Sequence, residues 1–318
     1  MEIVSSEERD FCEPVHKNDG IIDPGHKMLI RWDYPGSLGK SILVLVVVLI
    51  NACTTVPVTG RHQFMLIPER EAIAASVPAY FKMLNKPAKD GKLDNNPALQ
   101  TRVELIAGRL IAQAIRIRPD TANWQWSIHI IDEPKTVNAW AMAGGRMALY
   151  SGLVKRVKPS DDELAQVLGH EISHALAKHT AEQMSVALAT NLALATWAAS
   201  GDHQGLALTG ASLAAVLAVK LPNSRQAERE ADRIGIELAA RAGYDPHAAV
   251  SLWIKMKQAS PGGRMPEFLS THPAPEARLV ELRRLVPQMM RYYKPQLKHP
   301  VYHFKAAAEK LPREKRAR

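Results

Sequence analysis

The sequence contains little cysteine: Cys12 and Cys53 are its two cysteines among 318 residues. Two cysteines provide neither a framework of disulfides nor a zinc ribbon, in which several cysteines supply the ligands. A metal ion bound to this chain would therefore need histidine and carboxylate ligands. The 12 histidines and 32 acidic residues offer candidates for such ligands.

The sequence also lacks a long apolar segment and the motifs of nucleic-acid-binding proteins. A transmembrane helix needs roughly 20 apolar residues, and the apolar stretch from Ser41 to Ala52 is much shorter. The formal net charge is +9, but the basic residues are scattered and no aromatic and basic motif accompanies them. We therefore expect a globular protein with no nucleic-acid partner.

The stretch from Ser41 to Ala52 is typical of the apolar region of a signal peptide. Arg31 and Lys40 precede it, and the small residue Ala52 stands just before Cys53. Met28 is a more natural start for such a peptide than Met1. A buried strand is the alternative interpretation, because valine and isoleucine dominate the stretch.

The residues from Ile50 to Cys53 resemble the bacterial lipobox, at which the cysteine is diacylated and becomes the mature N-terminus. This resemblance implies lipidation of Cys53 and a periplasmic lipoprotein. Thr54 in place of an aspartate implies sorting to the outer membrane. The expected partner of this end of the chain is therefore a membrane.

Hydrophobic patterns after Cys53 predict one helix, then strands, then mainly helices. Apolar residues on one helical face occur between Pro97 and Arg118. Alternation between Trp124 and Leu153 predicts strands, and Gly144-Gly145 predicts a tight hairpin. Further along, Gly243 is typical of a helix end, and Asp245-Pro246 of the start of the next helix. We expect a mainly helical α+β fold with a small antiparallel sheet.

The segment from Ser160 to Thr180 predicts a capped helix that carries metal ligands. Ser160 and Glu163 have the spacing of a capping box. His170 and His174 are four residues apart, so they share one face of the helix and can both reach one ion. Neutral imidazoles suit Zn²⁺, and the carboxylate of Glu171 between them can take a proton from activated water.

A second predicted helix, from Asn223 to Gly235, offers a third ligand. Glu228 and Asp232 are four residues apart on one face, so one can bind the metal while the other orients a histidine. Glu230 is an alternative ligand by residue type. An exposed, charged helix is the alternative interpretation of the whole segment.

Four segments together resemble the HtpX-like zinc metallopeptidases of peptidase family M48, which also contains the membrane prenyl-protein endopeptidase. The resemblance extends over roughly residues 54 to 285. The segments are TGRHQFMLI from Thr59, NAWAMAGGRMALYSGL from Asn138, HEISHALAKH from His170, and SRQAEREAD from Ser224 followed by FLSTHP. The resemblance implies a gluzincin-like zincin domain that binds one Zn²⁺.

The resemblance also implies roles for single residues. Glu228 becomes the third zinc ligand beside His170 and His174, and Asp232 holds a zinc-bound histidine by its free N–H. An edge strand beside the active-site helix is implied to bind the substrate backbone as an added strand. Its residues are Asn138, Ala139, Trp140, Ala141 and Met142.

Three further features have more than one interpretation. His272 can donate to the developing oxyanion, bind zinc as a fourth ligand, or be a surface histidine before a proline. His179 follows His170 by nine residues, about 180° around a continuous helix, so we expect it not to bind metal. The Ala- and Leu-rich stretch from Met184 to Leu221 predicts buried or lid helices over the site rather than a membrane hairpin.

These observations divide the chain into four parts. Residues 1–53 form an N-terminal extension with a signal peptide, 54–96 an extended tether and lead-in helix, 97–287 the zinc metallopeptidase domain, and 288–318 a basic tail. The predicted function is zinc-dependent endopeptidase cleavage of unfolded or misassembled envelope proteins, with outer-membrane assembly or protease partners. The alternatives are a chaperone-like protein with a structural or closed zinc site and a membrane-associated lipoprotein with a fortuitous motif.

Overall fold

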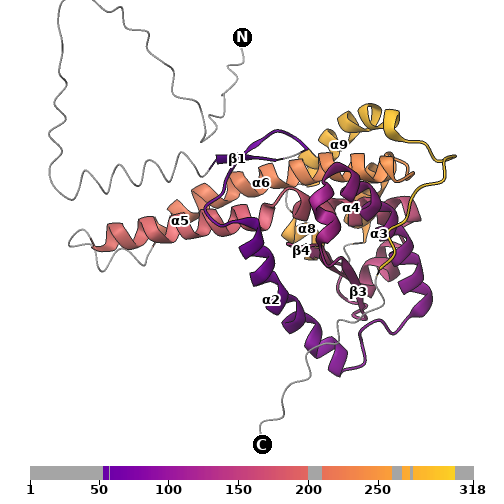
Figure 1. Cartoon of the computed structure of the whole chain (residues 1–318), viewed down its shortest axis with the longest axis horizontal. Coiled ribbons are helices and arrows are strands. Elements are labelled where there is room, and N and C mark those ends of the chain that lie inside the picture. Colours follow the sequence, from indigo (N-terminus) through magenta and orange to yellow (C-terminus); the bar gives the residue numbers. More distant parts are fainter. Residues whose placement is uncertain (1–52, 57, 200–209, 260–266, 273–274, 305–318) are drawn as a thin grey trace, which may run out of the picture.

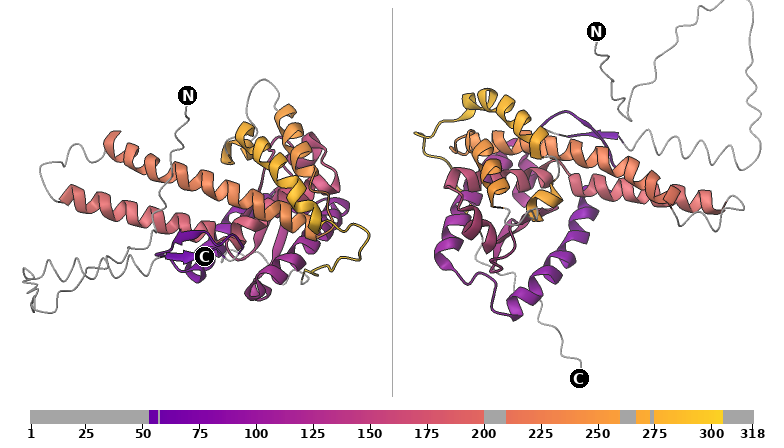
Figure 2. Two further views of the ribbon diagram at one scale, coloured as in Figure 1. Left: turned by 90° about the horizontal axis from the view of Figure 1, so that it is seen from above. Right: turned by 180° about the vertical axis from the view of Figure 1, so that it is seen from behind.

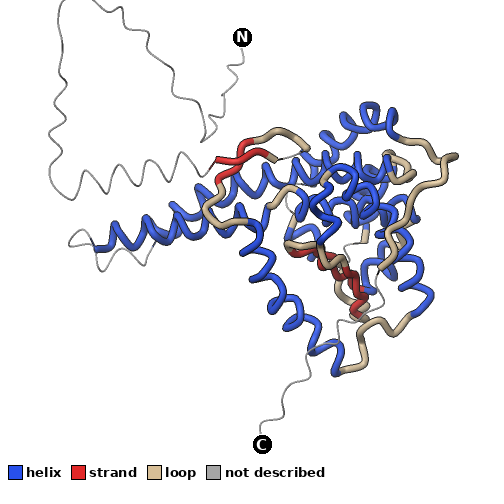
Figure 3. Tube along the Cα trace, viewed as in Figure 1, coloured by secondary structure: helices blue, strands red, loops and turns tan. Residues whose placement is uncertain are grey.

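The computed structural model describes residues 53–56, 58–199, 210–259, 267–272 and 275–304 (Figure 1). The predicted signal segment from Ser41 to Ala52 and residues 305–318 of the basic tail lie outside the described residues. Among those described, none of the helices combines the length and apolar character needed to cross a bilayer. The chain is mainly helical with two small sheets, as expected for an α+β fold (Figure 3).

The described elements follow one another in a simple order. A hairpin and two helices come first: β1 (Cys53–Thr55), β2 (His62–Phe64), α2 (Glu69–Lys89) and α3 (Pro97–Ile117). The central part contains η1 (Pro119–Asn123), β3 (Ser127–Ile131), β4 (Ala139–Met142), β5 (Arg146–Tyr150) and the π-helix η2 (Leu153–Val157). The remaining elements are α4 (Asp161–Leu176), α5 (His179–Ala199), α6 (Gly210–Arg241), α7 (Ala248–Gln258), α8 (Glu267–Thr271), α9 (Pro275–Met289) and η4 (Met290–Tyr292).

The larger sheet has the strand order β3-β5-β4, with β4 at one edge. The hairpin between β4 and β5 turns at Gly144 and Gly145, whose φ angles of 85° and 80° favour glycine. β5 pairs antiparallel with β4 but parallel with β3. The prediction of an antiparallel sheet is therefore wrong for the β3–β5 pair. The reason is that the chain reverses twice, once between β3 and β4 and again at the tight hairpin between β4 and β5, so β5 runs in the direction of β3.

The two faces of this sheet are covered by different helices. Ile128, Ile130 and Leu149 belong to the main core, which also contains the apolar faces of α3 and α4. The opposite face packs against Tyr80 and Leu84 of α2. The alternation of side chains along a strand thus places the sheet between α2 and the helices that carry the site.

The helix α4 begins as its sequence predicts. The Ser160 hydroxyl accepts from the backbone N–H of Glu163, and the Glu163 carboxylate accepts from the backbone N–H of Ser160, which completes the capping box. Thirteen of its residues are buried, including His170 and Glu171. The cap therefore fixes the first turn of a helix that lies inside the domain.

Two glycines bring the backbones of α4 and α6 into direct contact. A Cβ atom at Gly169 would lie 2.9 Å from the carbonyl oxygen of Gly235, and a Cβ atom at Gly235 would lie 2.8 Å from the backbone nitrogen of His170. Larger side chains at either position would push the helices apart. This contact lies next to His170 and two turns beyond Glu228, so it sets the distance between the two predicted ligand helices.

The helix α6 ends at Arg241 in a Schellman motif. Gly243 has a φ angle of 87°, its N–H donates to the carbonyl of Ala240, and the N–H of Tyr244 donates to the carbonyl of Ala239. The following helix α7 begins at Ala248 rather than at the predicted Pro246. The reason is that the Asp245 carboxylate accepts from the N–H of His247 in a preceding turn.

The predicted lid helices lie elsewhere than expected. The last turns of α5 and the first turns of α6 run side by side and project away from the rest of the domain (Figures 1 and 2). Leu188 and Leu192 on α5 are 47% and 58% exposed. The described parts of this projection therefore do not cover the site.

Candidate metal centre

Four side chains from three segments converge between α4 and α6. His170 and His174 come from α4, Glu228 from α6, and His272 directly follows α8. One ligand atom from each of the four lies within 4.8 Å of all the others. His170, Glu228 and His272 are buried, and His174 is nearly so. The structure therefore brings together the residues that the sequence analysis nominated as ligands.

The spacing of these atoms fits a tetrahedral metal site. Ligand atoms about 2.0–2.1 Å from a central Zn²⁺ stand roughly 3.3 Å apart. The Nε2 atoms of His170 and His174 are 3.0 Å apart, and they lie 3.3 and 3.5 Å from the carboxylate oxygens of Glu228. Nδ1 of His272 lies 3.2 Å from Nε2 of His170 and 2.9 Å from Glu228 Oε2. The donor set of imidazoles and one carboxylate also suits zinc.

His170 is held from behind by an acidic and a basic side chain. Its Nδ1 atom lies 3.1 Å from Oδ1 of Asp232, as expected for a carboxylate that orients a ligand histidine. Arg278 of α9 donates to both oxygens of Asp232 at 2.5 Å and to Glu228 at 3.0 Å. Its guanidinium lies 4.1 Å from the ring centroid of Trp253. Arg278 thus links the two carboxylates of α6.

His174 has a different supporting partner, His179. The two Nδ1 atoms are 2.9 Å apart, and Nε2 of His179 lies 3.1 Å from Oε2 of Glu230. His179 is outside the four-residue ligand group. The prediction that it lies about 180° from His170 around one continuous helix is wrong. The helix α4 ends at Leu176, Lys178 has a left-handed φ of 59°, and His179 begins the new helix α5.

Glu171 lies between the ligand group and the edge strand β4. Its carboxylate accepts from the N–H of Ala141 at 3.2 Å, and its Oε1 atom lies 3.4 Å from Nε2 of His272. Burial raises the pKa of Glu171, although His272 and His170 oppose this effect. A carboxyl group with a raised pKa beside a metal centre is suited to exchange protons with a substrate.

Glu228, Asp232 and His174 are held in states that suit ligation, whereas His170 is not. Burial and the charge of Arg278 lower the pKa of His170, but contacts with Asp232 and Glu228 raise it overall to about 9, so a metal ion would have to displace its extra proton. Burial raises the pKa of Glu228, but contacts with His170 and His272 lower it far below its usual value. Burial also raises the pKa of Asp232, but Arg278 and His170 lower it overall. Burial and the neighbouring charge of His170 lower the pKa of His174. Ionised carboxylates and a neutral His174 are the forms that bind a metal ion or orient its ligands.

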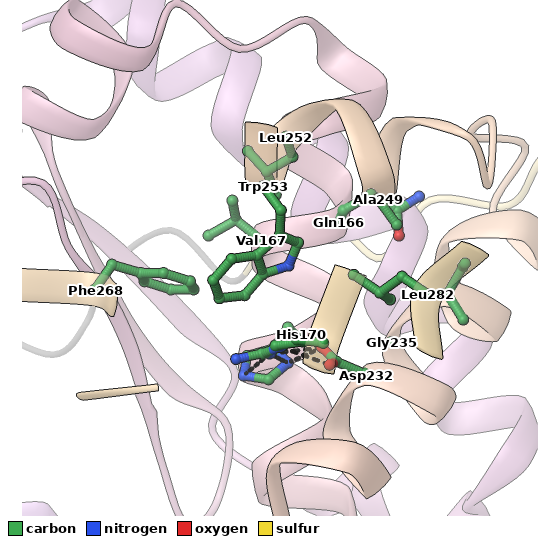
Figure 4. Close-up of a pocket in the computed structure, with 12 residues that line it drawn as sticks. Gln166, Val167, His170, Asp232, Gly235, Ala249, Leu252, Trp253, Phe268 and Leu282 are labelled. Atoms are coloured by element: carbon green, nitrogen blue, oxygen red, sulfur yellow. Dashed lines mark hydrogen bonds and ion pairs between the residues drawn. The ribbon is translucent and has the colours of Figure 1, made fainter. Parts of the chain in front are cut away.

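A small apolar pocket lies behind His170 and Asp232. Trp253, Phe268 and Leu282 form its wall, and dashed lines mark the contacts between His170 and Asp232 at its base (Figure 4). The ring centroid of Phe268 is 4.6 Å from that of His272. The pocket therefore surrounds one side of the ligand group with apolar side chains.

Comparison with known proteins identifies the family. The model of Peptidase family M48 matches residues 97–286. The chain belongs to peptidase family M48. It is 31% identical over 271 residues to the mitochondrial metalloendopeptidase OMA1 of Bos taurus, an alignment that covers 82% of this chain and 51% of the relative.

Two further relatives come from a fungus and a bacterium. The chain is 30% identical over 249 residues to the mitochondrial metalloendopeptidase OMA1 of Saccharomyces cerevisiae, covering 74% of this chain and 70% of the relative. It is 33% identical over 205 residues to the beta-barrel assembly-enhancing protease of Escherichia coli, an alignment that covers 62% of this chain and 41% of the relative. The chain spans about half the length of several curated relatives that it matches.

Sequence reasoning missed two kinds of residue in this site. No motif or spacing in the sequence singles out Arg278, and its buried contacts with α6 appear only in the folded chain. His179 and Glu230 were set aside as ligands, and their role as partners of His174 was not foreseen. A signal was present for both, since His179 belongs to the HEISHALAKH segment and Glu230 to the SRQAEREAD segment on which the family resemblance rests.

Proposed function

We propose that this chain is a zinc-dependent endopeptidase, with His170, His174 and Glu228 as the zinc ligands. The observation that carries the proposal is the spacing of their ligand atoms, 3.0 to 3.5 Å, with a buried carboxylate beside them. Zn²⁺ held there would supply a Lewis acid that activates water and polarises a scissile carbonyl. The chain's residues supply the rest of the chemistry.

Glu171 is the proposed general base and general acid. It takes a proton from the attacking water and later donates a proton to the leaving amine. Its raised pKa favours the second step, and its contact with the N–H of Ala141 holds it in place. The reaction involves no covalent bond between substrate and enzyme.

The edge strand β4 is the proposed binding site for the substrate backbone, over Asn138 to Met142. β4 pairs with β5 on one side. The N–H of Ala141 points away from β5 and toward Glu171, which places the outer edge of the strand beside the catalytic group. A polypeptide added to this edge would be bound mainly through its main chain, which gives broad side-chain specificity. We propose unfolded or misassembled polypeptides as substrates.

His272 is the proposed fourth ligand: swung in as in this structure it closes the site, and it must swing out before water can reach the metal. Its Nδ1 atom faces His170 and Glu228 rather than the outer edge of β4. This position favours the closed-site interpretation over a role at the oxyanion. The same position of His272 also supports a second candidate function, that of a chaperone-like protein whose zinc site is permanently closed.

We further propose that the chain is an outer-membrane lipoprotein of a bacterial periplasm, anchored through Cys53. Cys53 begins β1, which pairs with β2, so the lipid would be attached directly to the first strand. The E. coli relative's name, beta-barrel assembly-enhancing protease, supports envelope substrates and outer-membrane assembly partners. In this scheme residues 54–96 lead into a peptidase domain at 97–287.

The test combines metal content with cleavage. The purified full chain in detergent should hold one zinc ion and degrade denatured casein, and chelation should abolish degradation until zinc is restored. Zinc binding without cleavage of casein would favour the closed-site chaperone. A metal-free chain with unchanged behaviour would refute the zinc site.

A further inference from the structure

A chain of buried polar contacts runs from His174 to the β1–β2 hairpin. It consists of His179, Glu230 and Arg61, which we name the His174 support chain. His179 and Glu230 are 1% and 6% exposed. We propose that the His174 support chain positions His174 for metal binding and makes the hairpin part of the metal centre. This inference rests on the proposed zinc site.

The contacts of His179 determine which nitrogen of His174 carries the proton. The carboxylate of Glu230 can only accept, so Nε2 of His179, 3.1 Å away, donates to it. In the neutral ring of His179, Nδ1 then has a lone pair and accepts from Nδ1–H of His174 at 2.9 Å. The proton of His174 is thereby held on Nδ1, and its Nε2 lone pair faces Nε2 of His170 at 3.0 Å. This is the tautomer that a metal at the ligand group requires.

Thr59 and Arg61 fix the position of Glu230. Nε of Arg61 donates to Oε2 of Glu230 at 2.8 Å, and the hydroxyl of Thr59 donates to Oε1. The remaining nitrogens of Arg61 form two parallel bonds of 2.7 Å with Glu182 of α5. Arg61 therefore holds acidic side chains from α5 and α6 at a fixed separation. Glu230, fixed in this way, holds Nε2 of His179 through the 3.1 Å contact between them.

The residues that hold Glu230 and Glu182 belong to the β1–β2 hairpin. Thr59 and Arg61 lie between β1 and β2, and Gln63 of β2 is 1% exposed and donates to Glu182 at 2.9 Å. These residues belong to the TGRHQFMLI segment, which the proposed catalytic chemistry does not use. Each of the two proposed ligand histidines of α4 then has its own outer partner: Asp232 for His170 and His179 for His174.

Two substitutions of His179 separate positioning from space filling. Asparagine places an amide oxygen near the position of Nδ1, where it can accept from His174. Glutamine places its amide near the position of Nε2, where it can contact Glu230 but not His174. In a competition with a chromophoric chelator, His179→Gln should bind zinc at least about 10-fold more weakly than wild type, and His179→Asn within about threefold. Equal affinities for the two variants would overturn the proposal.

A second pair of variants tests the hairpin. Arg61→Met should weaken zinc binding, whereas Arg118→Met should not. Arg118 is a suitable control because it also binds two carboxylates, Glu69 and Asp120, and contacts none of the four ligand-group residues. Thermal unfolding of the zinc-free proteins shows whether both variants lose comparable stability. An Arg61→Met protein that folds and binds zinc like wild type would overturn the link to the hairpin.

The two proposals fail in different ways. A wild-type chain without measurable zinc affinity would refute the proposed function itself. Wild-type affinity combined with an unchanged His179→Gln variant would refute the His174 support chain alone. The d–d absorption spectrum of the Co²⁺-loaded protein provides a readout independent of activity, and His179→Gln should alter it because His174 changes its orientation.

Discussion

The backbone of Gly235 lies against the backbone of His170, so that a Cβ atom on Gly235 would come within 2.8 Å of the His170 nitrogen. Real Cβ atoms do not approach backbone this closely. The two helices that supply the proposed zinc ligands are therefore in contact through bare backbone. The ligand spacing depends on this contact as much as on the ligands themselves.

Gly235→Ala should force α4 and α6 apart. We expect a loss of about 1–3 kcal/mol in folding stability from overpacking, together with weaker zinc binding. Urea denaturation and chelator competition measure the two effects. Gly169→Ala should act through the same contact, so the double variant should lose less than the sum of the single variants. Full additivity would show that the glycines act separately.

Glu171→Gln should leave the fold and zinc content unchanged and lower kcat by roughly 10²–10⁴-fold. The amide keeps the shape of the side chain but can neither accept nor return a proton. Zinc analysis and casein degradation provide the measurements. Glu237→Gln, on a carboxylate that pairs with Arg241 of the same helix, is the matched control. Undiminished turnover in Glu171→Gln would exclude this residue as the base.

His272→Ala should retain zinc, because three ligands remain, and should raise casein cleavage severalfold. The reason is that its Nδ1 atom takes part in the ligand group and its removal opens a position for water. His247, whose side chain is 65% exposed, is the control for loss of a histidine. A drop in cleavage after His272→Ala would favour the oxyanion role instead.

Arg278→Met should cost about 3–5 kcal/mol of folding stability, because it leaves the buried carboxylates of Asp232 and Glu228 without their cationic partner. The loss should be smaller with zinc present, since the ion neutralises part of that charge. Arg284→Met on the same helix is the control: the Arg284 side chain is 64% exposed in its pair with Glu281. Its loss should leave stability nearly unchanged, because solvent screens an exposed ion pair. Similar losses in the two variants would contradict the role given to Arg278.

Asp132 should make stability depend on pH in the acid range. Hydrogen bonds from Ser151, Lys155 and Asn95 lower its pKa to about 2. Because this value is below the unfolded value of about 3.9, Asp132 stabilises the native state above pH 4, and this contribution disappears as the pH falls through 2. Asp132→Asn should therefore be less stable than wild type at pH 7, with a difference that vanishes near pH 2. A difference that is independent of pH in urea titrations would refute the linkage.

The sequence predicted the parts of the fold that depend on local chemistry. The capping box placed the start of α4 at Asp161, and Gly144-Gly145 placed the hairpin. The pairing of β3 with β5 is nonlocal, and no residue in either strand specifies whether its partner is parallel. The predicted start of α7 at Pro246 is wrong, because the Asp245 side chain caps a turn that precedes the helix.

The ligand group was predictable for a related reason. The four-residue spacing of His170 and His174 puts both on one helical face, and the same spacing relates Glu228 to Asp232. The residues that position these groups were not predictable by spacing. Arg278 lies 46 residues after Asp232, and His179 contacts His174 only because a left-handed residue, Lys178, redirects the chain between them.

The projection of α5 and α6 has a consequence for how the chain tolerates change. The first turn of α5 carries His179, and the second half of α6 carries Glu228, Glu230 and Asp232, so the described groups of the metal centre all lie away from the far ends of both helices. Lengthening, shortening or exchanging those ends would leave the chelating geometry intact. The far ends of α5 and α6 are therefore natural places to insert a label or a foreign module into the folded protein.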